Sequence, residues 1–187
     1  MSRRATPHDL VDYWEKAGPS KWFKKNDRFD QALTRRFGSM HMAAARGEYD
    51  DWEAQGAVGA LGLILLFDQI PRNIYRKTAH AFATDGRARA VARKAIAKGY
   101  DQEMATALRP FFYLPFEHSE DPSDQAFSAE LFRAHALASG DEDSLKWAIV
   151  HSQIIEQFGR FPHRNPALGR ETTAHEEMFL SEGGFGG

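Results

Sequence analysis

Signals that start and end helices recur along the whole chain, and they constrain its fold more than any other feature of the sequence. N-cap oxygens precede proline or an acidic residue, as at Thr6 and Asp121, and glycines such as Gly18 and Gly140 follow the periodic apolar stretches. Thr173 and Glu176 have the spacing of a capping box for a last short helix. We find no segment with the sustained alternation of apolar and polar residues that is typical of a half-buried strand. The pattern predicts an all-α protein of about eight helices in antiparallel pairs.

The most apolar stretch lies near the middle of the chain. Ala57–Phe67 is apolar on every face, so we expect this helix at the centre of the fold. A second apolar stretch, Phe111–Phe116, follows Pro110 and contains Pro115. We predict a short packed turn of core aromatic residues there. The expected helices occupy residues 6–18, 26–47, 57–67, 84–99, 101–108, 121–140, 141–159 and 173–180.

Composition excludes several classes of protein and site. The 187-residue chain has no cysteine, which excludes disulfide scaffolds, thiolate zinc sites, iron–sulfur clusters and cysteine nucleophiles. The 11-residue apolar run is too short to span a bilayer, and the first residues lack the apolar segment of a signal peptide. We therefore expect a cytoplasmic protein with no membrane partner, a single all-α domain over residues 1–182, and a flexible glycine-rich tail at residues 183–187.

The net charge of −2 hides an asymmetry between the two halves of the chain. Residues 1–100 have a balance of +7 and residues 101–187 a balance of −9. Neither half contains a run of like charges, and no nucleic-acid-binding motif is present. We therefore predict no nucleic-acid partner, and we interpret the asymmetry as two complementary halves of one domain that pack against each other.

Three polar segments differ from ordinary helix connections. Each combines prolines and apolar residues, which fix the backbone, with side chains that form strong hydrogen bonds. We expect loops that pack into the protein, so their polar groups must be paired. The three segments are Phe67–Arg76, Leu114–Asp121 and Gln157–Arg170.

Two polar residues are expected to face the core. Asp68 continues the buried stripe of the apolar helix and lies at its expected C-terminal end, where the helix dipole disfavours an acid. We therefore expect an arginine partner, either Arg72 nearby or Arg160 or Arg164 from the third segment. His151 also lies on a core-facing stripe. A histidine so placed is usually a satisfied core residue, but this helix leads directly into the third segment, which leaves a functional role open.

The first and third polar segments resemble each other. Phe67–Asn73 parallels Phe158–Asn165 with one residue inserted, and Arg76–His80 parallels Arg170–His175. The spacing of about 91 to 95 residues is half the chain, as an internal duplication would leave. We hypothesise an internal pseudo-repeat whose two Arg-Asn segments converge near the middle of the molecule.

The three segments also resemble a bacterial family, domain-of-unknown-function family 924. Its members share an Asp-Gln-Phe-Pro-Arg-Asn segment, a Pro-x-Glu-His-Ser-Glu segment, and a Phe-Gly-Arg-Phe-Pro-His-Arg-Asn segment followed by Leu-Gly-Arg. This chain matches them at Asp68–Asn73 (with Ile70 for the usual phenylalanine), Pro115–Glu120 and Phe158–Arg170. The resemblance implies a tetratricopeptide-like helical array, although the sequence shows no 34-residue repeat. It implies no particular activity.

Four interpretations of the polar segments remain open. They can form a structural network of ion pairs and hydrogen bonds, a small-molecule site, a metal site, or part of a module that binds a protein partner. A small-molecule site would use arginine and asparagine side chains to clamp a carboxylate or phosphate. The expected ligand-binding residues are Asp68, Arg72, Asn73, Arg160, Arg164, Asn165, Arg170 and His151.

Acid–base chemistry is the reaction class that suits these residues. His118 or His163 would be the general acid or base, with Glu117 or Glu120 orienting the imidazole. Several of these side chains are chemically suitable metal ligands, but no His-Glu-x-x-His spacing occurs and the nearby arginines repel a cation. We therefore predict binding of a small anionic molecule with no metal and no cofactor. The sequence leaves open whether the protein is an enzyme.

Overall fold

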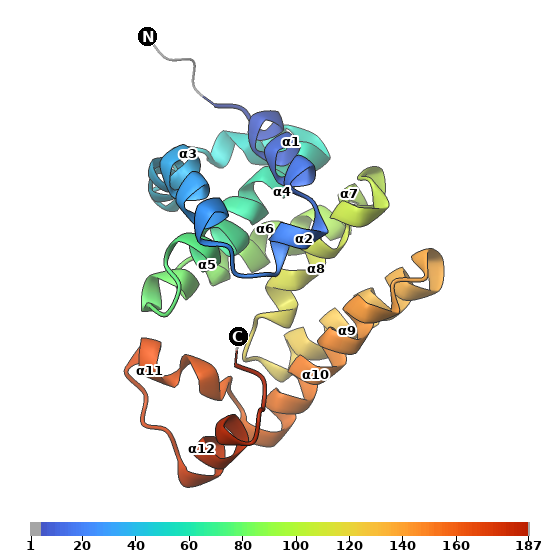
Figure 1. Ribbon diagram of the computed structural model, residues 1–187. Helices are drawn as coiled ribbons and strands as arrows, with labels where there is room; N and C mark the ends of the chain where they lie inside the picture. The colour runs from blue at the N-terminus through green and yellow to red at the C-terminus, as the bar shows by residue number, and fades with distance from the viewer. Residues whose placement is uncertain (1–4, 187) are drawn as a thin grey trace. The chain divides into compact units, whose positions relative to one another are not determined.

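A computed structural model describes residues 5–186 of the chain, which form two compact units coloured along the sequence in Figure 1. Unit 1 contains the described residues up to Arg76 together with His80–Pro115, and unit 2 contains Lys77–Ala79 and the residues from Phe116 onwards. No strand occurs among residues 5–186, so the all-α prediction is confirmed for them. The first four residues of the expected domain and Gly187 of the expected tail lie outside the described residues.

Local capping patterns start the first and third helices of unit 1 where the sequence predicts them. Thr6 and Asp9 form a capping box before the first helix, and the side chain of Asn26 accepts a hydrogen bond from Phe29 N at the start of the third. The helices are α1 (Pro7–Ala17), α2 (Pro19–Trp22), α3 (Asp27–Ala45), α4 (Gly56–Ile64), α5 (Ile70–Ile74), α6 (Asp85–Ala97), α7 (Tyr100–Glu103) and α8 (Pro110–Glu117), whose last residues belong to unit 2.

The apolar helix is buried as predicted, but it does not end at Phe67. Helices α4 and α5 are joined without a break by a π-helical turn at Leu65–Gln69, so the chain is helical from Gly56 to Ile74. The prediction of a loop in the first polar segment is therefore wrong for the residues up to Ile74, which are helical. This helix is long and apolar enough to cross a membrane by length and composition alone, yet 83% of its apolar 18-residue window is buried inside the protein.

Proline explains the π-helical turn. Pro71 has no N–H to donate to a carbonyl of the preceding turn. The carbonyls of Leu66 and Phe67 accept hydrogen bonds from side chains instead, from His41 Nδ1 (2.7 Å) and Thr84 Oγ1 (2.6 Å). Because these two carbonyls have side-chain partners, the helix continues through the proline.

The predicted aromatic turn is also helical. Phe111, Phe112 and Phe116 are at most 1% exposed and lie on α8, not in a turn, although the prediction that they belong to the core is confirmed. In unit 1 the Phe111 ring contacts Trp14 (5.6 Å between centroids) and Trp22 (5.0 Å). Burial of an aromatic side chain contributes about 1.5–3 kcal/mol, so several together outweigh the roughly 3 kcal/mol cost of a proline inside a helix.

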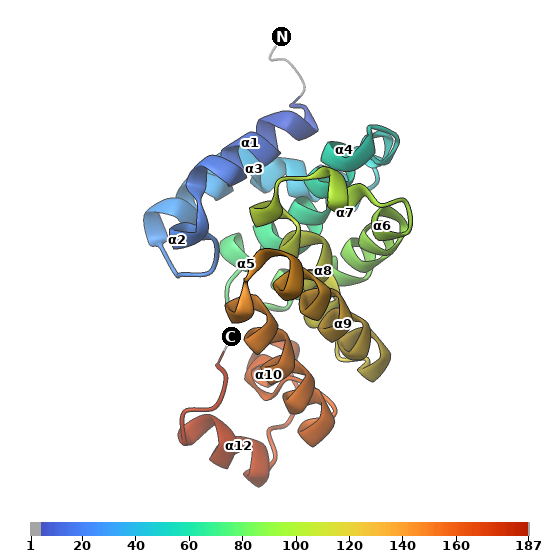
Figure 2. The same cartoon turned by 90° about the vertical axis from the view of Figure 1, so that its right-hand side faces the viewer.

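Unit 2 is built on a helical hairpin. Helices α9 (Pro122–Ser139) and α10 (Glu142–Phe158) lie side by side in both views, and the turn between them passes through Gly140 at φ +79° (Figure 2). The short helix α11 (Asn165–Leu168) and the terminal helix α12 (Ala174–Ser181) follow. The predicted capping box at Thr173 and Glu176 is confirmed.

Candidate functional site

The three polar segments form two networks, one in each unit. The first segment provides the network of unit 1. The second and third segments meet in unit 2, where Glu120 accepts hydrogen bonds from Arg170 (2.8 and 3.0 Å) and from Phe161 N (2.9 Å). The sequence did not show which segments pair.

Asp68 is fully buried in unit 1 and has the predicted arginine partner. Arg72 Nη1 lies 3.0 Å from Asp68 Oδ1, so of the three candidates the local arginine is the partner. Arg72 also binds both carboxylate oxygens of Asp85 (2.7 and 2.9 Å), a partner that the sequence did not indicate. Burial alone lowers the pKa of Arg72, but the two carboxylates raise it above its usual value. Because the helix continues to Ile74, the expected unfavourable dipole at Asp68 does not occur.

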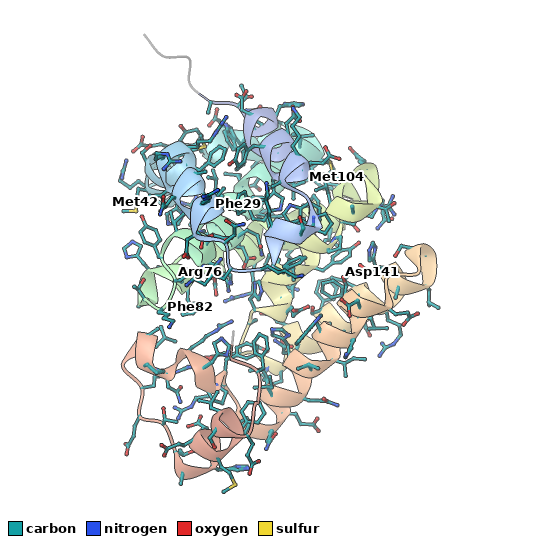
Figure 3. All side chains as sticks on the ribbon, viewed as in Figure 1. Phe29, Met42, Arg76, Phe82, Met104 and Asp141 are labelled. Carbon is teal, nitrogen blue, oxygen red and sulfur yellow. The ribbon has the colours of Figure 1, made fainter. Side chains whose placement is uncertain are left out.

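Asn73 and Arg76 complete the network of unit 1. Asn73 Nδ2 donates to the Gln69 carbonyl (2.9 Å), and Asn73 Oδ1 accepts from Arg76 Nη2 (2.8 Å). Arg76, labelled in Figure 3, binds the carboxylate of Asp30 on α3 (2.8 and 3.2 Å). These side chains link α5 and the residues after it to α3, and their polar groups form hydrogen bonds with other residues of unit 1.

Unit 2 has a similar network around the third segment. Arg170 donates to Asn165 Oδ1 (3.0 Å) and to the Phe161 carbonyl (3.0 Å) in addition to its two bonds with Glu120. Burial raises the pKa of Glu120, but the hydrogen bonds from Arg170 and Phe161 N outweigh this effect, so the pKa is lowered overall. Glu120 is thus a charged structural partner of Arg170.

Arg160 binds Glu176, a residue that the sequence identified only as part of a capping box. The distances are 2.6 Å from Nε and 2.8 Å from Nη2 to the carboxylate oxygens. Asn165 Nδ2 and Thr173 N donate to the same carboxylate (3.3 and 2.8 Å). The hydrogen bonds from Arg160 are the main cause that lowers the pKa of Glu176 to about 2.

Glu176 therefore makes the stability of the protein depend on pH. Its pKa rises from about 2 in the folded state to its usual value near 4.5 on unfolding, so its stabilising effect is complete above pH 4.5 and is lost as the pH falls towards 2. We expect Glu176→Gln to be less stable than the wild type at pH 6, with a difference that shrinks steadily between pH 4.5 and 2. Urea unfolding across this range measures it. Glu177→Gln, an exposed neighbour on α12, is the control, and an equal pH dependence in both variants would contradict the assignment.

His151 has an orienting partner on α8. Its Nδ1 lies 2.8 Å from the Trp147 carbonyl and 3.2 Å from Glu117 Oε1. A carbonyl oxygen only accepts, which assigns the proton of the neutral ring to Nδ1 and leaves Nε2 with a lone pair. Both His151 and Glu117 are buried, at 6% and 3% exposure. The sequence expected His118 or His163, not His151, to be the oriented imidazole.

Basic side chains gather around His151. Burial is the main cause that lowers the pKa of His151 to about 3, and the neighbouring His118, Arg164 and His163 lower it further. The His118 and His151 rings are 6.4 Å apart, and the buried guanidinium of Arg164 lies 4.3 Å from the centroid of the Phe161 ring. We name His118, His151, His163 and Arg164 the histidine–arginine cluster; all four belong to unit 2.

No group of three or more histidine, aspartate or glutamate side chains that could hold a metal ion occurs among residues 5–186. His118, Glu120, His151 and His163, the suitable ligands in the sequence, therefore do not form such a group. Two carboxylates of the second polar segment have partners within the chain: Glu117 contacts His151, and Glu120 binds Arg170.

The comparisons with known proteins extend over both units. A family model described as a bacterial protein of unknown function, DUF924, matches residues 10–184. The solved structure of a protein of unknown function, ATU0120 from Agrobacterium tumefaciens, is 48% identical to this chain, covers 95% of it and 97% of its own chain, and superposes with a TM-score of 0.87. No curated protein matches the sequence.

Proposed function

Because the chain belongs to the bacterial family DUF924, whose description states no activity, we propose a function from its own geometry: the histidine–arginine cluster of unit 2 binds a small anion, a carboxylate or a phosphate. The observation that carries this proposal is the proximity of these basic side chains to one another. The buried His151 ring lies 6.4 Å from His118, and the rings of His151 and His163 lie 5.5 and 5.7 Å from Phe161. The guanidinium of Arg164 lies 4.3 Å from the centroid of the same Phe161 ring. An anion placed there relieves the repulsion among them.

The other arginines of the polar segments fit a structural role. Each of Arg72, Arg160 and Arg170 already binds a carboxylate of the chain through two nitrogens or two oxygens. These arginines fit the structural interpretation of the polar segments, in which ion pairs hold helices together. Among the residues predicted to bind a ligand, His151 and Arg164 belong to the cluster. The pair of Arg72 and Asp85 in unit 1 shows how an arginine of this protein binds a carboxylate.

The pairing of Glu117 and His151 adds an acid–base function to this proposal. Because the proton stays on Nδ1, the lone pair of Nε2 can accept a proton from a bound molecule, while the Glu117 carboxylate stabilises the imidazolium that forms. With a pKa of about 3, His151 is a weak base when the site is empty. A bound anion would raise this pKa, so His151 would become a competent base only in the complex.

Anion binding is tested by thermal shift and calorimetry with inorganic phosphate and acetate as probes. A ligand at about 100 times its dissociation constant adds roughly 2.7 kcal/mol, which raises the melting temperature by about 5–11 °C for a chain of this size. We expect Arg164→Gln to abolish the shift, because it removes the permanent charge of the cluster.

The matched control is Arg133→Gln, an exposed arginine on α9 in the same unit, which should leave the phosphate-induced shift intact. Absence of a shift with every phosphate and carboxylate tested would contradict the proposal. A shift that survives Arg164→Gln would contradict the assignment to the cluster.

We also propose that the internal duplication predicted from the sequence is real, within a tetratricopeptide-like ancestry of the helices. Its support is a repeated motif in the two networks. In unit 1 Arg76 donates to Asn73 Oδ1 and binds the carboxylate of Asp30, and in unit 2 Arg170 donates to Asn165 Oδ1 and binds Glu120. In each segment the asparagine precedes its arginine, by three residues in the first segment and by five in the third. Superposition of the two segments in a crystal structure tests the proposal, and unrelated backbone paths would contradict it.

A further inference from the structure

The segment after α12 folds back onto the histidine–arginine cluster. The ring of Phe185 lies 4.5 Å from His151 and 5.1 Å from His163 between centroids, and 5.9 Å from Trp147. Both imidazoles also contact Phe161, at 5.5 and 5.7 Å. Each imidazole therefore touches two phenyl rings, one from the interior of unit 2 and one from the last residues of the chain.

Glycines make this return of the chain possible. Gly183 has φ +88°, in the left-handed region, and Gly184 N donates to the Phe179 carbonyl (2.9 Å). A Cβ atom on Gly184 would lie 2.5 Å from that carbonyl oxygen and 2.6 Å from the Phe179 ring, so no other residue fits. Gly186, on the other side of Phe185, would meet no atom within 4 Å. The ring is thus carried by a short backbone segment with glycines on both sides.

Phe185 and His163 are both half-buried, while the rings of His151 and Phe161 are more enclosed. Phe161 is fully buried and His151 is 6% exposed. Glycine-flanked backbone regains much conformational freedom when a contact opens, which favours brief opening of this segment over opening of α10 or α12. The Phe185 contact can therefore open without unfolding a helix.

We propose that Phe185 is a lid on the histidine–arginine cluster, hinged at Gly183 and Gly184, and that its opening admits the anion. The identity of the ligand in this inference rests on the proposed function, whereas the motion of Phe185 does not. In the closed state the ring covers the imidazoles of His151 and His163. In the open state both imidazoles are accessible, and the fraction of open molecules limits the apparent affinity for the anion.

Histidine reactivity tests the lid without any ligand. Diethyl pyrocarbonate modifies neutral imidazoles, and peptide mass spectrometry reads its rate at each histidine. If the open state is populated at 10% or less, the lid slows modification about tenfold or more. We expect Phe185→Ala to raise the rate at the buried His151 by about that factor, and at the half-buried His163 by a smaller factor, while the exposed His175 of α12 stays unchanged as an internal standard.

A pair of glycine variants separates the lid from any effect of losing the phenyl ring. Gly184→Ala cannot form the turn at Phe179, so it should raise the same two rates with Phe185 still present. Gly186→Ala should leave them at the wild-type value. Unchanged rates at both histidines in Phe185→Ala and Gly184→Ala would overturn the lid, and so would an equal increase at His175, since that indicates general loosening of unit 2.

Phosphate distinguishes the failure of the lid from the failure of the proposed function. We expect inorganic phosphate to protect His163 from modification, and to do so at a lower phosphate concentration in Phe185→Ala than in the wild type. If the variants raise reactivity but phosphate protects neither protein, the lid stands and anion binding fails. If phosphate protects His163 equally in all variants, anion binding stands and the lid is overturned.

Discussion

Gly59→Ala is expected to destabilise unit 1 by about 3 kcal/mol, at the upper end of the cost of overpacking a core. A Cβ atom at Gly59 would lie 1.9 Å from the Trp52 carbonyl oxygen and 2.9 Å from Gln55 Cβ. That carbonyl belongs to the 3₁₀ turn Asp50–Ala54 and accepts a hydrogen bond from Gln55 N, so it cannot move away without breaking the turn. The intrinsic gain of alanine in a helix, about 1 kcal/mol, is too small to offset this clash.

Urea unfolding followed by the fluorescence of the buried Trp14 and Trp52 measures this loss in unit 1. Gly38→Ala is the matched control, because Gly38 also lies inside a helix of unit 1 but its added Cβ would make ordinary contacts of 3.9 Å with Ile74 and Thr34. We expect this control to stabilise the protein by about 0.5–1 kcal/mol. Equal effects of the two substitutions would contradict the close approach of Trp52 to α4.

The starts and ends of helices were predictable because their causes are local. Thr6 with Asp9, and Thr173 with Glu176, place both partners of a capping box within four residues of sequence. Gly140 and Gly159 take the left-handed conformation that ends α9 and α10. Such signals need no knowledge of the tertiary structure.

The continuation of the helix through Pro71 could not be predicted in the same way. A proline normally ends a helix. It does not do so here because the side chains of His41 and Thr84, which are distant in sequence, donate hydrogen bonds to the freed carbonyls. The partners of the charged residues show the same limit. Asp68 has the local Arg72, which the sequence offered as a candidate, whereas the bond between Glu120 and Arg170 joins residues 50 positions apart.

The candidate site was predicted in its residue types more than in its arrangement. His151 was recognised as a core-facing imidazole, but its pairing with Glu117 depends on how α8 meets α10. Phe185 lies in a tail whose glycines predict flexibility, and its contacts with His151 and His163 depend on a turn held by the Phe179 carbonyl. The flexibility of residues 183–187 stays a prediction, and the reactivity of the two histidines reports on it.

Arg72→Met is expected to destabilise unit 1 by about 3–5 kcal/mol, the cost of removing one partner of a buried ion pair. The side chain of Asp68 is 0% exposed and that of Arg72 only 16%, so Asp68 would lose its cationic partner where little water can replace it. Asp85 would lose both of its hydrogen bonds to the guanidinium. Urea unfolding at pH 7 measures the effect.

Arg76→Met is the matched control, since Arg76 follows the same helix and also binds an aspartate through two nitrogens. Its side chain is 36% exposed, so water replaces the lost partner and we expect a cost of about 1 kcal/mol or less. Asp68→Asn combined with Arg72→Met should recover part of the loss, because the amide removes the buried charge while keeping its shape. Equal costs for the two arginine substitutions, or a double variant worse than the sum of its parts, would mean that the charge of Asp68 is not what Arg72 stabilises. In that case Arg72 would act mainly through Asp85 and the Asp68 carbonyl, to which its Nη1 also donates (3.0 Å).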